Sequence, residues 1–456
     1  MTDHDTDTDI AVIGAGIIGI ATAYYLKKAD PRLKVTLIDQ GQPMAFTSAQ
    51  SGENYRNWWP HPLIKHFTDH SIDLMETIAR ETENRINMTR SGYVLATRLL
   101  DVNDLATALF AGYGDDPDKD IRIHDDSTSQ AYAPAGFEQW QVAPSGVDVL
   151  CGETLIKKHY PWYGAGLRTL VHIRRAGMID SQQMGQVMLE QFRQWGGKRL
   201  QARLTAVETK RGFVLVFDNG AEKLHTAMAV NAAGPFLNDV AHLFGLELPV
   251  RNVLQQKIAF EDVAGAIPRQ MPFSIDLDSH CIDWNEEERE LLLADPDHAW
   301  MAREMPGAVH CRPDGGEKGS WVKLGWAYNE TPTQARLEPQ FDDHFPELVL
   351  RGAARLNPSL KAYFERLPRN RTHYGGYYTM TRENWPLIGP MAVEGAYVVG
   401  AMSGFGTMAA CASGELCADW VLDGDLPAYA EQLSLQRYQN TNLMAELNAQ
   451  QDRGLL

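Results

Sequence analysis

Cysteine is scarce in this sequence of 456 residues. Its five cysteines form no CxxC pair and no Cys/His spacing typical of a metal site. An odd number of thiols spread over a long chain does not support a disulfide framework. We therefore expect free thiols and no bound metal.

Basic residues and long apolar runs are also in short supply. The chain has 42 Lys and Arg against 59 Asp and Glu, a formal net charge of −17 at pH 7. Nucleic acid and anionic membranes both attract clustered basic residues, so neither is expected as a partner. The longest apolar stretch near the N-terminus, residues 10–26, contains three glycines, and no leader-like pattern precedes it. We expect a cytoplasmic protein without membrane insertion, and both a monomer and an oligomer stay open.

The first forty residues have the pattern of a βαβ unit. Residues 10–13 and 35–38 are apolar runs typical of buried strands, and residues 17–28 between them have helical character. The helix must end before Asp30-Pro31, because proline cannot continue it.

The turn Gly14-Ala15-Gly16-Ile17-Ile18-Gly19 satisfies the GxGxxG pattern. The three glycines permit a tight strand exit, close approach of a pyrophosphate and close helix packing, and the helix N-terminus offers free N–H groups to phosphates. Asp39 follows Gly19 at the distance where a carboxylate can accept ribose hydroxyls, and it disfavours NADP. FAD and NAD both fit this fingerprint.

Five further segments decide between FAD and NAD: Thr47-Ser48, Ala176 to Asp180, Val230 to Gly234, Glu383 to Gly389, and Ser403 to Gly406. Their order resembles the D-amino-acid oxidase (DAO) superfamily of FAD-dependent oxidoreductases, which includes glycine oxidase and sarcosine oxidase. The resemblance implies FAD as the cofactor. It also implies an α/β fold, with a Rossmann-type FAD-binding domain and a second α+β substrate domain built on an antiparallel sheet.

The resemblance further implies a discontinuous domain arrangement. We expect residues 1–92, 166–243 and 373–456 to form the FAD-binding domain, and residues 93–165 and 244–372 to form the substrate domain. Residues 274–320 are charged and contain the turn Gly315-Gly316, so their composition predicts an insertion or lid-like excursion in the substrate domain.

The predicted FAD-binding residues come from these motifs. They are Gly14, Gly16, Ile17, Ile18, Gly19, Asp39, Thr47, Ser48, Val207, Ala233, Gly234, Gly404, Phe405, Gly406 and Thr407. The last four form a glycine turn that opens a helix, whose positive end suits the negative charge of a reduced flavin. The position where sarcosine oxidases attach FAD through cysteine falls near Gly376, with no cysteine within thirty residues, so we expect noncovalent FAD.

Two residues are predicted to face the substrate. Arg56 aligns with an arginine that binds the substrate carboxylate in sarcosine oxidase, and a guanidinium offers two parallel hydrogen bonds for that purpose. Tyr378 aligns with a tyrosine of the substrate pocket. The alternatives are a surface or interdomain salt bridge for Arg56 and a packed strand for Tyr378. Met408 replaces the lysine that sarcosine oxidases place after the glycine turn, so substrate anchoring must differ.

The reaction implied by the resemblance is oxidation of the C–N bond of a small amine or amino acid, such as an N-substituted glycine or a D-amino acid. Hydride transfer to flavin N5 would give an imine that water hydrolyses. A 2-hydroxy-acid dehydrogenase, which needs a histidine base, and the flavin-bearing subunit of a heteromeric oxidase are the alternatives. The electron acceptor, oxygen or a quinone or other carrier, stays open. Lys257 is assigned to a strand rather than to oxygen activation.

Overall fold

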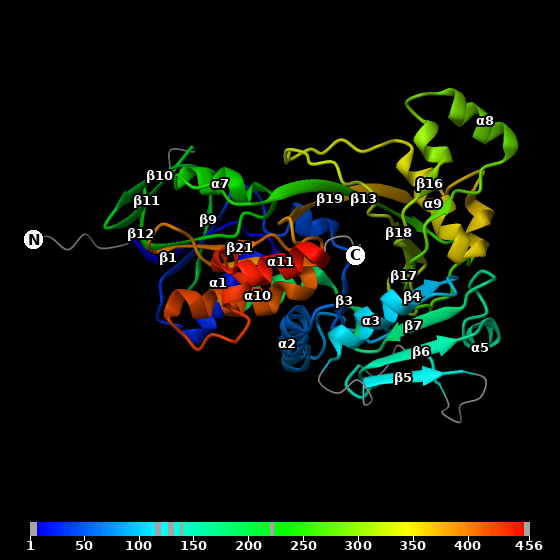
Figure 1. Ribbon diagram of the computed structural model, residues 1–456. Helices are drawn as coiled ribbons and strands as arrows, with labels where there is room; N and C mark the ends of the chain where they lie inside the picture. Colours follow the sequence, from blue (N-terminus) through cyan, green and yellow to red (C-terminus); the bar gives the residue numbers. More distant parts are fainter. Residues whose placement is uncertain (1–6, 115–119, 126–131, 137–139, 219–222, 451–456) are drawn as a thin grey trace, which may run out of the picture.

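The computed structural model describes residues 7–114, 120–125, 132–136, 140–218 and 223–450. Two large sheets form the two halves of the molecule, and helix α2 (Pro62–Glu81) lies between these halves (Figure 1). The N-terminal strand belongs to the first half, and the chain passes several times between the two.

The first half is built on an eight-stranded sheet. Its strands are β1 (Thr8–Ile13), β2 (Val35–Asp39), β9 (Lys198–Gln201), β10 (Leu204–Lys210), β11 (Gly212–Phe217), β12 (Leu224–Asn231), β20 (Leu387–Pro390) and β21 (Ala396–Gly400). β1 pairs in parallel with β2 and β12, β2 with β9, and β12 with β21. β10 and β11 extend the sheet as an antiparallel hairpin. Asn219 and Gly220, which the sequence favours as a hairpin turn, lie between β11 and β12 and outside the described residues.

The predicted βαβ unit is confirmed. β1 leads through the glycine turn into α1 (Ile17–Ala29), which returns the chain to β2 beside β1. β1 is apolar without alternation because both faces of the parallel sheet are covered, and Ile10, Ala11 and Val12 have no exposed surface. The Rossmann-type half of the predicted fold class is therefore present.

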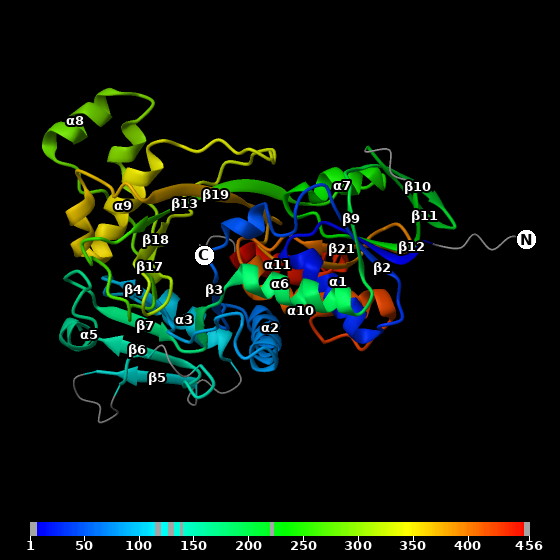
Figure 2. The same ribbon diagram turned by 180° about the vertical axis from the view of Figure 1, so that it is seen from behind.

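Helices cover this sheet and connect the strands of both halves. They are α1, α2, α3 (Asn103–Gly112), α5 (Glu153–His159), α6 (Ser181–Gln194), α7 (Leu237–Leu243), α8 (Glu286–Ala294), α9 (Phe345–Leu356), α10 (Gly406–Leu422) and α11 (Thr441–Gln450). α1 packs tightly on α10, where a Cβ at Gly414 would stand 2.5 Å from the Ala21 carbonyl carbon. α1 also packs on α6, and the view from behind shows α1, α6 and α10 together (Figure 2).

The second half is built on a nine-stranded sheet. Its strands are β4 (Tyr93–Thr97), β5 (Ile121–His124), β6 (Val147–Cys151), β7 (Thr169–Ile173), β13 (Arg251–Glu261), β14 (Phe273–Asp276), β17 (Val309–Asp314), β18 (Trp321–Gly325) and β19 (Arg371–Met380). The order is β19-β13-β18-β17-β14-β4-β7-β6-β5. The pairings are antiparallel except β14 with β4 and β5 with β6.

Several strands of the nine-stranded sheet lie in segments that were expected in the FAD-binding domain or in the insertion. β7 and β19 belong to the nine-stranded sheet, although residues 166–243 and 373–456 were expected in the FAD-binding domain. β14 and β17 are also strands of this sheet, so the expected insertion at 274–320 begins and ends inside it. Between them the short pair β15 (His280–Cys281) and β16 (Glu304–Met305) accompanies α8, which lies at the end of the molecule far from the eight-stranded sheet (Figure 1 and Figure 2).

No helix among the described residues is both long and apolar enough to cross a membrane.

Candidate functional site

The turn after β1 has the geometry that its glycines predict. Gly14 has φ +109°, and a Cβ there would stand 2.4 Å from the Ala232 carbonyl oxygen. A Cβ at Gly19 would stand 1.9 Å from the Gly14 oxygen, so α1 can approach the strand only without a side chain. A Cβ at Gly16 would meet only the Ser48 hydroxyl, at 3.1 Å. Gly14 and Gly19 therefore serve the fold, whereas Gly16 leaves room for a ligand.

Two polar side chains hold this turn in place. Asp39 at the end of β2 accepts hydrogen bonds from the backbone N–H groups of Ala15 (2.7 Å) and Gly41 (2.7 Å). Ser48 lies in the 3-10 helix η1 (Thr47–Gln50), and its hydroxyl accepts a hydrogen bond from the Ile17 N–H at 2.9 Å. Both residues therefore shape the turn after β1, residues 14–19, which we call the nucleotide turn. The cofactor contacts predicted for them stay predictions.

A hollow of about 610 Å³ opens beside Asp39 at the carboxyl ends of β2 and β9. Its lining comes from Gln40, Gln201, Ala202, Arg203 and Asp218. The predicted cofactor residue Val207 is not among these residues. It lies in β10 opposite Leu215, with β11 and β12 between it and β1.

Ala233 and Gly234 follow β12 after Ala232, next to the turn after β1. The Ala232 N–H donates to the Ile13 carbonyl at 2.8 Å, which holds the ends of β1 and β12 together. Gly234 has φ +56° and begins the 3-10 helix η2 (Gly234–Phe236).

The turn that opens α10 is conformationally strained. Gly404 has φ +93°, and the non-glycine residues Ala401 (φ 57°) and Ser403 (φ 44°) also adopt left-handed conformations. Phe405 precedes the first helical residue, Gly406. The Thr407 hydroxyl is hydrogen-bonded to the Ser51 hydroxyl at 2.8 Å, which joins this turn to the loop after η1. The sequence motif located this turn but not the strain at Ala401 and Ser403.

Arg56 is almost completely buried, with 2% of its surface exposed. It lies on β3 (Asn54–Arg56), which pairs with β8 (Ala176–Met178). Its guanidinium carbon stands 4.5 Å from the ring centre of Trp59 and 5.1 Å from that of Tyr93. Its Nε and one terminal nitrogen have no hydrogen-bond partner among the residues that the structure describes. Burial lowers the pKa of this guanidinium, which nevertheless stays a cation.

Arg56 lies one aromatic ring away from the turn before α10. The rings of Trp59 and Phe405 are 4.7 Å apart, and Trp59 also lies under the Arg56 guanidinium. The predicted substrate residue Arg56 and the predicted cofactor residue Phe405 are therefore held against the same side chain.

Tyr378 reaches the same turn from the other sheet. It lies on β19, and a Cβ at Gly404 would stand 2.4 Å from its ring. Gly376, two residues earlier, faces η1: a Cβ there would stand 3.3 Å from Gln50 and 3.4 Å from Thr47. Strand β19 thus brings its residues against both the glycine turn and the loop after β2.

A row of polar residues on β13, β17 and β18 was not predicted from the sequence, although Lys257 was placed in a strand. Because side chains alternate between the faces of a strand, apolar residues such as Val322 and Leu324 pack into the core of the second half, and Lys257, His310, Arg312 and Lys323 share the opposite face. We call these four residues with Tyr374 and Tyr378 the polar face. The alternation in residues 309–314 and 321–325 was a readable signal for it.

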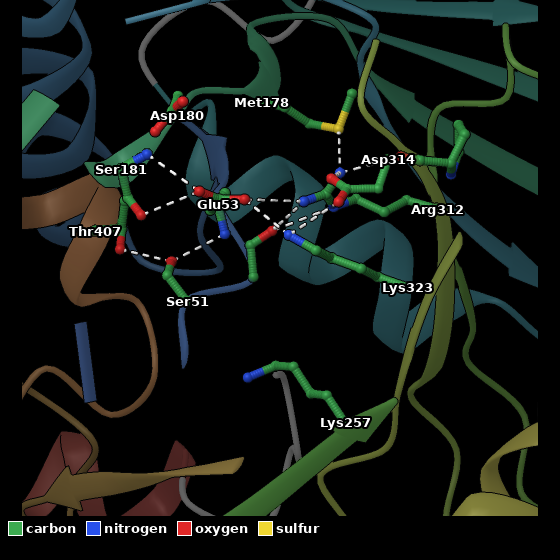
Figure 3. Close-up of polar contacts among 12 residues, drawn as sticks. Ser51, Glu53, Met178, Asp180, Ser181, Lys257, Arg312, Asp314, Lys323 and Thr407 are labelled. Atoms are coloured by element: carbon green, nitrogen blue, oxygen red, sulfur yellow. Dashed lines mark hydrogen bonds and ion pairs between the residues drawn. The ribbon is translucent and has the colours of Figure 1, made fainter. Parts of the chain in front are cut away.

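Glu53 joins the polar face to the loop after η1 (Figure 3). Its carboxylate accepts from the Lys323 ammonium at 2.8 Å and from Ser181, whose N–H begins α6. Arg312 donates to the Gly52 carbonyl at 2.9 Å and to Asp314 at 2.6 Å. Glu53 itself has φ +61°, a left-handed conformation that these contacts maintain.

The residues present fit a flavin dinucleotide. The Gly16 turn is open, the hollow beside Asp39 lies at the carboxyl edge of the sheet, and Gly404 in the turn before α10 lies against Tyr378 on the second sheet. The parallel strands β1 and β2, joined by this turn and α1, form a Rossmann-type dinucleotide-binding unit. The polar face of the second sheet contacts the loop after η1. Among the described residues, no three His, Cys, Asp or Glu side chains gather into a possible metal site.

Residues 9–420 match the family model described as FAD dependent oxidoreductase (DAO). The chain therefore belongs to the DAO family of FAD-dependent oxidoreductases, and its cofactor is FAD. The family resemblance and the fold class predicted from the sequence are confirmed.

Solved structures share the fold over almost the whole chain. L-proline dehydrogenase from P. horikoshii is 16% identical with a TM-score of 0.72, covering 95% of this chain and 98% of that one. Glycine oxidase from Geobacillus kaustophilus is 15% identical (TM-score 0.68; 94% and 98% covered). Iminodiacetate oxidase from Chelativorans sp. BNC1 is 16% identical (TM-score 0.64; 93% and 98% covered). A comparison with curated proteins found no match.

Proposed function

We propose that this enzyme oxidises the C–N bond of a small amino acid, such as an N-substituted glycine or a D-amino acid, to an imine that water hydrolyses. Bound FAD supplies the hydride acceptor. The structural neighbours named as glycine oxidase, iminodiacetate oxidase and L-proline dehydrogenase support a substrate that carries both an amine and a carboxylate.

The observation that carries the proposal is the unpaired charge of Arg56. The buried arginines of the described chain are Arg56, Arg90, Arg174, Arg312 and Arg437. Four of them have a carboxylate within ion-pair distance, and within the described residues Arg56 has none. A buried cation without a counter-ion is costly. A substrate carboxylate would supply the missing charge and two parallel hydrogen bonds.

The 2-hydroxy-acid alternative has one supporting observation. It requires a histidine base, and His310 lies on the polar face next to Gly325, across from Lys257. Burial lowers the pKa of His310 to about 4, which makes it a weak base near neutral pH. The amine reading is therefore the stronger of the two.

The test is anaerobic bleaching of the flavin by a panel of N-substituted glycines, amino acids of both hands and 2-hydroxy acids, followed by admission of air. Bleaching by an amino compound is expected, and recolouring in air would identify oxygen as an acceptor. Bleaching only by hydroxy acids would contradict the proposal.

Variants of Arg56 test the carboxylate contact with the compound that bleaches the flavin. Arg56→Ala should weaken substrate binding by about 2–5 kcal/mol, roughly 30- to 5,000-fold, with normal FAD content. Arg56→Lys should recover only part of this loss, because an ammonium lacks the planar fork. Arg85→Ala, at an exposed pair with Glu190, is the control. Unchanged affinity in Arg56→Ala would make Arg56 structural, and loss of flavin would assign it to the cofactor.

A further inference from the structure

Lys257 resembles Arg56 in being a buried cation with no carboxylate partner among the described residues. It lies on β13 with 8% of its surface exposed. Among the described residues, the only hydrogen bond of its side chain goes from Nζ to the Gln50 carbonyl, at 3.4 Å. In Figure 3 it extends from β13 apart from the network around Glu53. Lys323, on the same face, is by contrast paired with both Glu53 and Asp314.

The surroundings of Lys257 place its amine at the junction of the two halves. Nζ stands 5.7 Å from the ring centre of Tyr378, and that ring lies against Gly404 in the turn before α10. Gln50 ends η1, the element whose Ser48 holds the nucleotide turn. The amine is therefore one ring away from the turn where the reduced cofactor's charge is expected.

Within the described part of the chain, no carboxylate lies within ion-pair distance of Lys257, and burial is the only cause of its pKa shift. On β19 its neighbours are Tyr374 and Tyr378, and burial raises the pKa of both phenols, so both stay neutral. On β17 the nearest titratable group is His310, whose lowered pKa also keeps it neutral. Burial without a counter-ion lowers the pKa of Lys257 to about 8.

The proposed reaction needs a proton acceptor at this place. An amino acid arrives as an ammonium ion, whose nitrogen has no free electron pair, and the hydride can leave the adjacent carbon only after the nitrogen regains that pair. Resting on the proposed function, we infer that Lys257 is the base that deprotonates the substrate ammonium. A substrate N–H bond breaks and a Lys257 N–H bond forms. The freed pair then forms the C=N bond as the hydride leaves.

The experiment measures anaerobic flavin reduction from pH 6 to 10 with the amino substrate that the panel identifies. Lys257→Met keeps the volume of the side chain without a base, and Lys257→Arg keeps a cation that cannot lose its proton. Both should reduce flavin at pH 7 roughly 10²-fold more slowly or worse. Their rates should rise with pH until the free substrate amine titrates, because neutral amine then arrives from solution.

Lys27→Met is the matched control. Lys27 is also a buried lysine, but it lies at the far end of α1 and donates to the backbone carbonyls of Pro31 and Leu33. This variant should keep the wild-type pH profile even if it is less stable. FAD content is measured on every preparation.

A second readout uses no variant and no turnover. A substrate analogue with a thioether in place of the amine cannot titrate near neutral pH, so any pH dependence of its binding reports the protein. Its dissociation constant, followed by flavin absorbance, should change near pH 8 in the wild type and lose this inflection in Lys257→Met.

Four results would overturn the assignment. Wild-type reduction rates in Lys257→Met across the pH range would make Lys257 structural. A defect confined to reoxidation by oxygen would assign it to the second half-reaction, and loss of FAD would assign it to the cofactor. If the dissociation constant of the analogue shows no inflection near pH 8 in the wild type, Lys257 does not lose its proton in that range. Failure of every amine and amino acid to reduce the wild-type flavin would instead refute the proposed function.

Discussion

Two buried arginines show how this chain separates stability from binding: Arg437 is in an ion pair, and Arg56 has no carboxylate partner among the described residues. Arg437 is 1% exposed and Arg56 is 2% exposed. Arg437 donates to Glu383 at 2.7 Å and to the carbonyl of Pro386. Arg56 contacts aromatic rings, and no carboxylate among the described residues lies within ion-pair distance of it.

The difference shows which buried charges hold the fold and which await a ligand. The pair of Arg437 and Glu383 closes the segment after β19 against the C-terminal turns, and both partners are desolvated together. At Arg56 the cost of burial has no compensation within the described chain. An unpaired buried cation is tolerated at a functional site, because a bound anion offsets the free-energy cost of its burial.

The largest effect on stability is expected from removing one partner of the buried ion pair between Arg437 and Glu383. Glu383→Ala leaves Arg437 buried without its counter-ion, so the free energy of unfolding should fall by about 3–5 kcal/mol. Chemical denaturation with FAD in excess measures it. Glu190→Ala, which opens the exposed pair with Arg85, should change stability little. Equal effects of the two variants would remove the distinction between buried and exposed pairs.

The unpaired site should behave in the opposite way. Arg56→Met replaces an uncompensated charge with an apolar side chain, so the substrate-free protein should be as stable as the wild type or more stable. A carboxylate ligand at 100 times its dissociation constant should stabilise the wild type by about 2.7 kcal/mol and Arg56→Met far less. Thermal denaturation with and without ligand measures both. Strong destabilisation of ligand-free Arg56→Met would show that Arg56 has a structural partner.

The same contrast applies to the glycines of the nucleotide turn. Gly16→Val should weaken FAD binding by roughly 100-fold or more, about 2.7 kcal/mol, since its side chain would enter the open space of the turn. Gly136→Val, where a Cβ meets nothing within 4 Å, is the control. Flavin absorbance per protein gives the occupancy. Full FAD content in Gly16→Val would contradict the assignment of this turn to the pyrophosphate.

The smallest effect is expected from pH. His172 accepts from the Tyr132 hydroxyl at 2.7 Å, and burial lowers its pKa from 6.5 to about 3. Below pH 6.5 the unfolded state takes up a proton that the folded state refuses, so this contribution to stability is complete above pH 6.5 and declines as pH falls toward 3. At pH 5 the loss should be about 2 kcal/mol.

His172→Gln keeps an acceptor without a titrating group and should lose correspondingly less stability between pH 7 and 5. Urea denaturation at the two pH values measures the difference. His242→Gln, at an exposed histidine, is the control and should follow the wild type. An identical pH response of His172→Gln and the wild type would show that His172 is already protonated in the fold.

The second sheet shows why some of the site could not be read from the sequence. Residues 274–320 looked like an insertion because they are charged and contain Gly315-Gly316, yet β14 and β17 within them are central strands. The charges of Arg312 and Lys323 belong to one face of the sheet, whose other face is apolar. Lys257 was correctly assigned to a strand. Its neighbours on the adjacent strands are tens of residues away in sequence or more, so the sequence could not show that Lys257 has no carboxylate partner among the described residues.

What the sequence determined by itself is local. The spacing of Gly14, Gly16 and Gly19 fixes a turn within one strand and one helix, and the order of the motifs identifies the family, because both depend on residues close together in the chain. The tertiary structure decided which charges are paired. Arg56 and Lys257 meet aromatic rings and a carbonyl instead of carboxylates, because strand register and the packing of two sheets bring those neighbours from distant segments.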